Sequence, residues 1–323
     1  MRSNHIKFFD KNIDRKSKII KDTLNFINNS NTPLPSLIEI SDSGTCNRFC
    51  SFCPRSDPSY KDVKEFISDK LHNKICKELS DLNYKGLIMY SGFNEPMLNK
   101  KIYRNISSAR KHLPDAKIEL ITNGDVLNHE RLEMLFNSGL TTLLISVYDG
   151  PEDMLKFKKM CQAVGLDEKQ YVIRNRYLPP EQDYGITMSN RGGMMQNAQH
   201  AIKSLKNPLK KKCNYPSYTF FIDYNGDVLM CSHDWGKKNI LGNLNNNTIL
   251  DIWMSEKSKK TRKALIEGNR NFSPCDVCDV KGNLIGNTHA DAWSKIFRNM
   301  WVCLFSSNLP DIPKAGKVKK ITL

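Results

Sequence analysis

The stretch Cys46-Asn-Arg-Phe-Cys50-Ser-Phe-Cys53 places three cysteines in one short segment. It follows closely on Ser36-Leu-Ile-Glu-Ile-Ser41, an apolar run that predicts a strand. In β/α folds, loops at the carboxyl ends of parallel strands form the active site. Three thiolates on such a loop can bind three irons of a 4Fe–4S cluster and leave the fourth iron open to a small molecule. Zinc would need a fourth ligand, for which His72 and Asp57 are the local candidates.

Length and composition exclude several classes of protein. The chain has 323 residues, of which 39% are hydrophobic, so it can form a full core and about two domains. No segment approaches the ~18 consecutive apolar residues of a membrane span. The first 18 residues have no apolar signal core, so we expect a cytoplasmic protein with no membrane partner. Its ten cysteines then indicate metal binding rather than disulfides. The net charge of +15 attracts anions, but the basic residues are dispersed, as on a solvated surface.

Short apolar runs alternate with helical patterns in the first two thirds of the chain. Strands are predicted at residues 36–41, 86–90, 117–122, 142–146 and 171–174. Apolar residues at helical spacing predict helices between them, one of which spans Val63 to Leu79. The alternation predicts an α/β fold with a parallel sheet, either barrel-like or doubly wound.

After about residue 200 the alternation stops and a second cysteine group follows. Asn225-Gly226 predicts a hairpin turn that brings Cys213 and Cys231 together, and Cys275 and Cys278 supply a closely spaced pair. Four such cysteines can bind one zinc ion or one 4Fe–4S cluster, and their spacing by itself favours zinc.

The Cys-x3-Cys-x2-Cys motif with Phe52 before the last cysteine resembles the signature of the radical S-adenosylmethionine (SAM) superfamily. The resemblance implies a partial (β/α) TIM-like barrel of five to six parallel strands, with a small C-terminal metal-cluster domain. It implies that Cys46, Cys50 and Cys53 hold a 4Fe–4S cluster that binds SAM, and that Phe52 packs near the adenine. The implied organisation is an N-terminal helical extension (1–35), the barrel (36–200), an auxiliary-cluster domain (201–303) and a tail (304–323).

Further motifs at the predicted strand ends are similar to those that contact SAM in the superfamily. Tyr90-Ser-Gly92-Phe-Asn-Glu95-Pro96 is similar to its Gly-Gly-Glu-Pro segment, with Asn94 where glycine is usual. The resemblance implies SAM contacts from Gly92 and Glu95, with the carboxylate of Glu95 holding the SAM ammonium group. Three more polar residues are expected to contact the SAM ribose or carboxylate: Asn123, Ser146 and Arg174. Arg176 shares the strand face of Arg174 and is the alternative cation.

The second cysteine group is similar to the auxiliary-cluster domains called SPASM and twitch. This similarity favours iron–sulfur over zinc at Cys213, Cys231, Cys275 and Cys278. Only Cys303 follows the Cys275–Cys278 pair, which implies one auxiliary 4Fe–4S cluster, as in the twitch form.

We therefore expect an enzyme that cleaves SAM to a 5′-deoxyadenosyl radical and removes a hydrogen atom from its substrate. The expected reaction is a two-electron oxidation of a small polar or sugar-like metabolite, with the auxiliary cluster accepting the second electron. Candidate bases are Arg191, Asp223 and His233. Electrons would come from a reductant such as flavodoxin or ferredoxin.

Two alternatives are a peptide-modifying maturase and a zinc-stabilised nucleic-acid-binding protein without catalysis. The first is disfavoured because only about 35 residues precede the first predicted strand, too few for the leader-binding domain common in maturases. The second is disfavoured because no basic patch with interleaved aromatic residues is evident, so nucleic acid is not expected as a partner. RNA modification by radical chemistry is a third option.

Overall fold

Six parallel strands form the centre of the molecule. The computed structural model describes residues 12–27 and 30–306. Its main sheet has the order β10-β9-β8-β1-β4-β5-β6-β7. Strands β8, β1 and β4 to β7 run parallel, and β9 pairs antiparallel with both β8 and β10. The strands are β1 (Leu37–Ser41), β4 (Leu87–Tyr90), β5 (Lys117–Thr122), β6 (Thr142–Val147), β7 (Tyr171–Asn175), β8 (Thr219–Asp223), β9 (Asp227–Leu229) and β10 (Ile240–Asn243). The predicted α/β class and partial barrel are confirmed.

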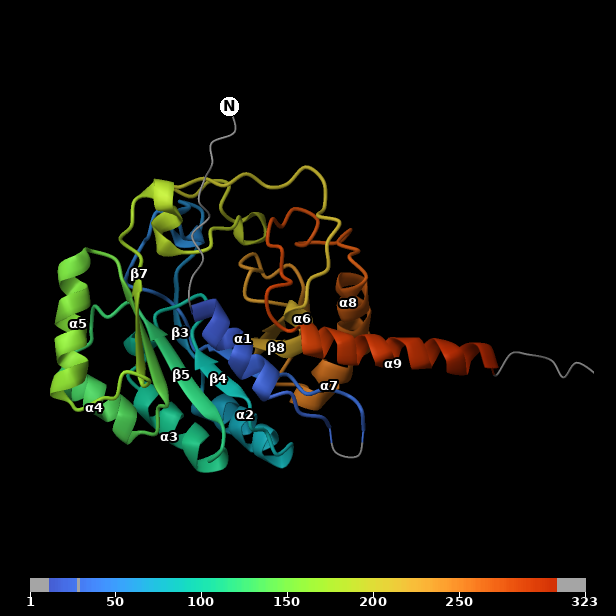
Figure 1. Ribbon diagram of the computed structural model, residues 1–323, viewed down its shortest axis with the longest axis horizontal. Coiled ribbons are helices and arrows are strands. Elements are labelled where there is room, and N and C mark those ends of the chain that lie inside the picture. The colour runs from blue at the N-terminus through green and yellow to red at the C-terminus, as the bar shows by residue number, and fades with distance from the viewer. Residues whose placement is uncertain (1–11, 28–29, 307–323) are drawn as a thin grey trace, which may run out of the picture.

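Four helices follow strands in turn and cover one face of the sheet, along the left and lower sides of Figure 1. They are α2 (Asp69–Asp81), α3 (Ile102–His112), α4 (His129–Asn137) and α5 (Pro151–Ala163). Their apolar residues, such as Ile75 and Ile106, pack with alternate strand residues such as Ile38 and Ile88 in the largest hydrophobic core. The alternation predicted from the sequence therefore positions the strand ends along one edge.

The predicted helix from Val63 to Leu79 is wrong in its first part. Residues Val63–Phe66 form strand β3, which pairs with the short strand β2 (Ser43–Gly44). Helix α2 begins only at Asp69, because the Ser68 side chain accepts a hydrogen bond from the backbone N–H of Leu71 and caps it.

The opposite face of the sheet is covered by the N-terminal helix α1 (Asn12–Asp22). Ile19 and Ile20 pack there against Leu37, Leu87 and other residues that point away from α2 to α5. Since these contacts lie near the amino ends of the strands, α1 closes that end of the barrel interior. The first 11 residues of the predicted N-terminal extension lie outside the described residues.

The C-terminal region shares the main sheet. Strand β8 pairs parallel with β1 over Leu37↔Thr219 to Ser41↔Asp223, and β9 returns after the predicted turn at Gly226. Segments from both sides of the domain boundary predicted at residue 200 therefore belong to one continuous sheet. Helix α6 (Tyr215–Tyr218) packs on β8, and α7 (Ile249–Met254) packs on β10. The helices α8 (Glu256–Ile266) and α9 (Asn287–Ser306) pack on α6 and on each other.

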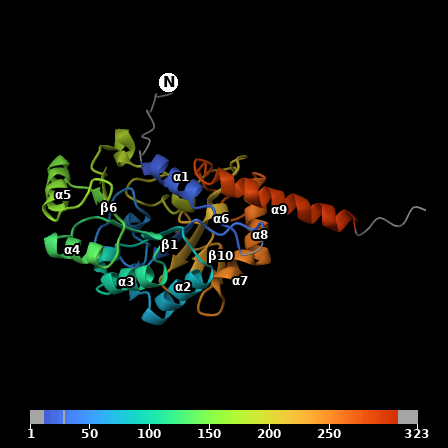
Figure 2. The ribbon, with the colours of Figure 1, turned by 60° about the horizontal axis from the view of Figure 1, so that its bottom comes forward.

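Helix α9 extends away from the rest of the molecule in both views (Figures 1 and 2). The predicted tail begins within this helix, and its residues from 307 onward lie outside the described part. Across the described residues, no helix combines the length and apolar character needed to cross a membrane.

Candidate active site

The three cysteines of the first group open into one large cavity. Cys46, Cys50 and Cys53 lie on the loop after β2, and all three line a cavity of about 740 Å³ at the carboxyl edge of the parallel strands. Buried Arg55 fixes the end of this loop, donating hydrogen bonds to the carbonyls of Phe93 and Gly44 and pairing with Asp62. The loop is therefore tied to the β4 side of the cavity.

The thiols of this loop are free and partly buried beside the cavity. Burial raises the pKa of Cys46 to about 11 and that of Cys50 to about 12, and it also raises the pKa of Cys53. Across the described residues, no three His, Cys, Asp or Glu side chains converge as ligands of a single ion would. Thiolates of an iron–sulfur cluster each bind a different iron and need not converge on one point. Three free thiols beside a cavity thus fit a cluster with one open iron.

Glu95 links two strand ends at this cavity. It is 2% exposed, and its carboxylate accepts hydrogen bonds from the backbone N–H of Asn123 (2.7 Å), the hydroxyl of Thr122 (2.8 Å) and the backbone N–H of Met97 (2.9 Å). Burial raises the pKa of Glu95 to about 7, against the effect of these bonds. Its carboxylate therefore holds the ends of β4 and β5 together as well as lining the cavity.

Gly92 allows the chain to turn into the site. Its φ of +121° lies where side chains are rarely tolerated, and an added Cβ would lie 2.8 Å from Cβ of Ser41. Glycine at position 92 therefore has a steric basis, whereas Asn94 is held by hydrogen bonds to Asp42 and Ser43.

The remaining predicted SAM contacts also line the cavity. The amide of Asn123 donates to Asn47 on the cluster loop (2.7 Å), and Arg174 donates to the hydroxyl of Ser146 (2.7 Å). Arg176 lines the same wall but donates to the carbonyl of Gly185. The structure thus couples Arg174 to Ser146, while Arg176 supports the loop after β7.

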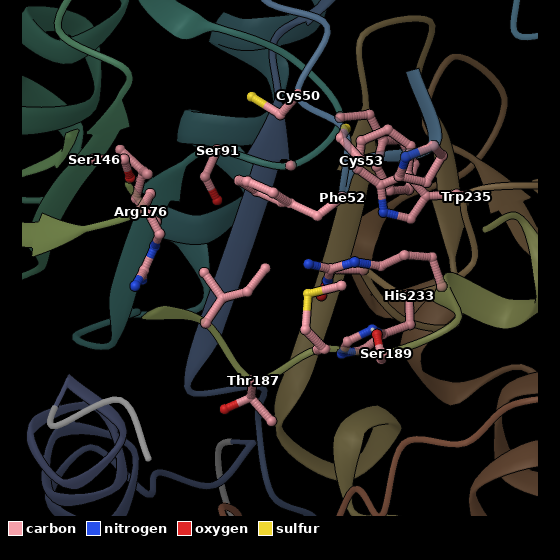
Figure 3. A pocket seen from close by; sticks show the side chains of 18 of the residues that line it. Cys50, Phe52, Cys53, Ser91, Ser146, Arg176, Thr187, Ser189, His233 and Trp235 are labelled. Carbon is pink, nitrogen blue, oxygen red and sulfur yellow. Dashed lines mark hydrogen bonds between the residues drawn. The ribbon is translucent and has the colours of Figure 1, made fainter. Parts of the chain in front are cut away.

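Phe52 lies in the middle of the cavity, between the barrel side with Ser146 and Arg176 and the C-terminal side with His233 and Trp235 (Figure 3). Its ring packs on the ring of Tyr184, with 4.6 Å between the centroids. An aromatic ring therefore lies in the cavity, as the predicted contact with adenine requires.

The candidate bases are separated by the structure. Arg191 and His233 line the cavity, and His233 lies 3.2 Å from the hydroxyl of Tyr215 through Nε2. Burial lowers the pKa of His233 to about 3, with the charge of Arg191 acting in the same direction. Asp223 does not line the cavity, because it lies buried at the end of β8 in an ion pair with Lys237. The structure therefore separates Asp223 from the cavity that Arg191 and His233 line.

The four cysteines of the second group are buried near the cavity wall that Tyr215 and His233 form. Cys213, Cys231, Cys275 and Cys278 are all buried and unbridged, and the charges of Cys213, Cys275 and Cys278 raise the pKa of Cys231. An added Cβ on Gly282 would lie 2.3 Å from Sγ of Cys213. This glycine therefore leaves room beside the thiol that any larger residue would fill. The side chain of Cys303 lies outside the described residues.

Sequence reasoning missed Glu39. This residue lies on β1, lines the cavity, and accepts a hydrogen bond from the Ser91 hydroxyl (2.7 Å) although it is only 6% exposed. A charged residue inside an otherwise apolar strand was the signal that could have found it.

A three-cysteine loop that opens into a cavity at the ends of parallel strands defines a radical SAM enzyme, and the chain belongs to the radical SAM superfamily. The model of that superfamily matches residues 40–174, and the model of an iron–sulfur cluster-binding domain, SPASM, matches residues 213–280. The iron–sulfur domain settles the choice that the cysteine spacing left open, and the non-catalytic zinc protein is excluded. A radical SAM cluster, SAM and an auxiliary iron–sulfur site are the cofactors of this class.

Among individual proteins, the chain is similar to the S-adenosyl-L-methionine-dependent 2-deoxy-scyllo-inosamine dehydrogenase of Niallia circulans. The two are 30% identical over 249 residues, which cover 77% of this chain and 93% of the relative. The crystal structure of BtrN in complex with AdoMet and 2-DOIA matches with a TM-score of 0.64 and 27% identity, over 77% of this chain and 94% of BtrN. An open conformation of BtrN matches with a TM-score of 0.57 and 24% identity, over 76% and 93%, and supports the fold. The predicted oxidoreductase class is confirmed.

Proposed function

We propose that this enzyme oxidises a secondary hydroxyl group on a small polyhydroxylated ring that also carries an amine, and that it forms a ketone. The similarity to an inosamine dehydrogenase over most of both chains supports the reaction. The single observation that carries the substrate class is Glu39, a buried carboxylate that lines the cavity.

The charge of Glu39 requires a partner. In the sheet register Glu39 aligns with Met89, which aligns with Glu119, so both glutamates share one layer of the barrel interior. Glu119 pairs with Arg15, whereas Glu39 has no ion pair with any described residue. A buried carboxylate without a cation is costly. A protonated amine on the substrate would supply that cation and fix which carbon of the ring faces the radical.

The other half of the cavity is assigned to SAM. When bound, the cluster and SAM supply a radical that removes a hydrogen atom from carbon. In this proposal Arg174 and Ser146 bind the SAM carboxylate and ribose, and Asn123 and Glu95 hold its polar groups at the strand ends. The ring of Phe52 packs on the adenine. These contacts orient SAM toward the substrate, and the walls of the cavity exclude water.

Removal of a hydrogen atom leaves a substrate radical that must lose one electron and one proton to become a ketone. The proposal assigns the electron to one auxiliary 4Fe–4S cluster at Cys213, Cys231, Cys275 and Cys278. This assignment is supported by the sequence, since Tyr215 and His233 line the cavity and each follows a cluster cysteine by two residues. Arg191 and His233 remain the candidates for handling the proton. The first cluster would draw its electrons from a flavodoxin-like or ferredoxin-like protein.

The test is turnover of the anaerobically prepared holoenzyme with SAM, dithionite and 2-deoxy-scyllo-inosamine or related aminocyclitols. We expect one 5′-deoxyadenosine per ketone, and a product lighter than the substrate by two hydrogen atoms. Matched cyclitols that carry hydroxyl in place of the amine serve as the control and should react poorly. Equal turnover of both series would contradict the role of the amine. Modification of a peptide instead would replace the proposal with the maturase alternative.

A further inference from the structure

Arg270 holds together the two chain segments that carry Cys213 and Cys278. It follows α8, is 2% exposed, and donates four hydrogen bonds to backbone carbonyls. Two acceptors precede Cys213, namely Lys211 (2.9 Å from Nε) and Lys212 (3.2 Å from Nη2). Two follow Cys278, namely Val280 (2.7 Å from Nη1) and Lys281 (2.7 Å from Nη2). The guanidinium of Arg270 thus holds the segment before Cys213 next to the segment after Cys278.

The charge of Arg270 has no carboxylate partner among residues 12–27 and 30–306. Its four hydrogen bonds all go to neutral backbone carbonyls. Its guanidinium lies beside the auxiliary site, since it reaches the carbonyl of Lys212, the residue before Cys213, and that of Val280, two residues after Cys278. A buried cation needs a compensating negative group. The groups placed to provide it are the cysteines of the auxiliary site.

A second buried arginine in the same region shows a different solution. Arg262 is 1% exposed and also lacks a carboxylate partner in the described structure. Its guanidinium lies between the rings of Trp253 and Trp293, 4.1 Å and 3.9 Å from their centroids. Cation–π attraction therefore compensates Arg262, and burial lowers its pKa to about 9. No aromatic ring among the described residues takes this role for Arg270.

We propose that Arg270 is the counter-charge of the auxiliary iron–sulfur cluster and raises its reduction potential. Four thiolates make such a cluster anionic, and its one-electron reduction adds a further negative charge. A fixed cation nearby stabilises the reduced form more than the oxidised form, which favours electron acceptance. This inference depends on the auxiliary cluster alone and holds whatever the substrate is.

The test is a potentiometric titration of the full-length holoenzyme with dithionite and mediator dyes, followed by electron paramagnetic resonance. The auxiliary signal is identified as the one that persists when Cys46, Cys50 and Cys53 are all replaced by alanine. We expect Arg270→Gln to lower the reduction potential of the auxiliary cluster by at least about 59 mV, which is a tenfold change in the equilibrium constant for one-electron reduction. Arg270→Lys keeps the positive charge and should shift the reduction potential less. Arg262→Gln is the matched control and should leave it unchanged.

Unchanged potential in an Arg270→Gln enzyme with full iron content would overturn the proposal, as would an equal shift in Arg262→Gln. Should Arg270→Gln fail to retain auxiliary iron, Arg270→Lys becomes the deciding variant. Retention of iron in the lysine variant, with a potential near that of the unmodified enzyme, supports the role of the charge. Loss of iron from the lysine variant, while Arg262→Gln retains it, would overturn the proposal. It would show that the hydrogen bonds of Arg270, and not its charge, maintain the auxiliary site.

Discussion

Arg15 of α1 holds Glu119 of β5 through two parallel hydrogen bonds, Nη1 to Oε1 at 2.6 Å and Nη2 to Oε2 at 2.9 Å. The two residues are 104 positions apart, and Glu119 is 1% exposed. This ion pair fixes α1 across the closed end of the barrel. It also supplies a cation to one of the two glutamates in this layer of the barrel, whereas Glu39 has no ion pair with a described residue.

Arg15→Ala is predicted to destabilise the protein, because it leaves the carboxylate of Glu119 buried without a partner. Loss of one partner of a fully buried pair costs about 3–5 kcal/mol. We expect roughly 1–3 kcal/mol here, because the Arg15 side chain is 31% exposed and its charge is partly screened. Thermal unfolding measures the effect. Lys85→Ala breaks an exposed pair with Asp115 and should change stability by less than about 0.5 kcal/mol. Equal effects of the two substitutions would refute the prediction.

Glu39→Gln is predicted to reduce kcat/KM for an amine-bearing substrate by about 10- to 150-fold, the loss of roughly 1.5–3 kcal/mol for a hydrogen bond to a charged group. Steady-state kinetics with the amine and its hydroxyl analogue measure the effect. The analogue should lose little activity, since glutamine still accepts a hydrogen bond from hydroxyl. A similar loss for both compounds would mean that Glu39 only maintains the shape of the site.

The two cysteine groups are predicted to serve separable steps. Cys46→Ala, Cys50→Ala or Cys53→Ala should abolish SAM cleavage, because each removes a ligand of the SAM-binding cluster. Cys275→Ala should spare SAM cleavage and abolish net oxidation, because the acceptor of the second electron is lost. Quantifying 5′-deoxyadenosine and ketone in parallel distinguishes the steps. Undiminished ketone formation by Cys275→Ala would remove the acceptor role.

Stability is predicted to fall as pH rises from about 4 to about 7, in part through Asp42. Burial raises the pKa of Asp42 from 3.8 to about 7, although Asn99 and Asn94 donate hydrogen bonds to it. The folded state therefore retains a proton that the unfolded chain has lost. The stabilisation this provides is complete below pH 3.8 and is lost as pH passes through 7.

Asp42→Asn removes this titration, so the melting temperature should depend less on pH between about 4 and 7 than in the unmodified protein. The matched control is Asp115→Asn, the same substitution at an exposed position. An Asp42→Asn variant that loses stability as steeply as the unmodified protein would show that other groups cause the dependence.

Features carried by short spacings could be predicted from the sequence. The cluster loop from Cys46 to Cys53, the turn at Gly226 and the motif from Gly92 to Glu95 each depend on a few neighbouring residues. Their chemistry therefore follows from local geometry, and so does the alternation of strands and helices that identifies the parallel sheet. The lining of the cavity by Ser146 and Arg174 follows as well, because parallel strands end at one edge.

Contacts between distant parts of the chain were decided by the tertiary structure. The sequence alone determined which cysteines can bind metal and the class of fold. Only the fold determined that β8 joins β1, that Asp223 turns to Lys237 rather than to the cavity, and that Arg270 ties the segments next to Cys213 and Cys278 together. The physical reason is that a strand's register sets which face every side chain occupies. That register depends on packing between segments more than a hundred residues apart, as in the pairing of Leu37 with Thr219.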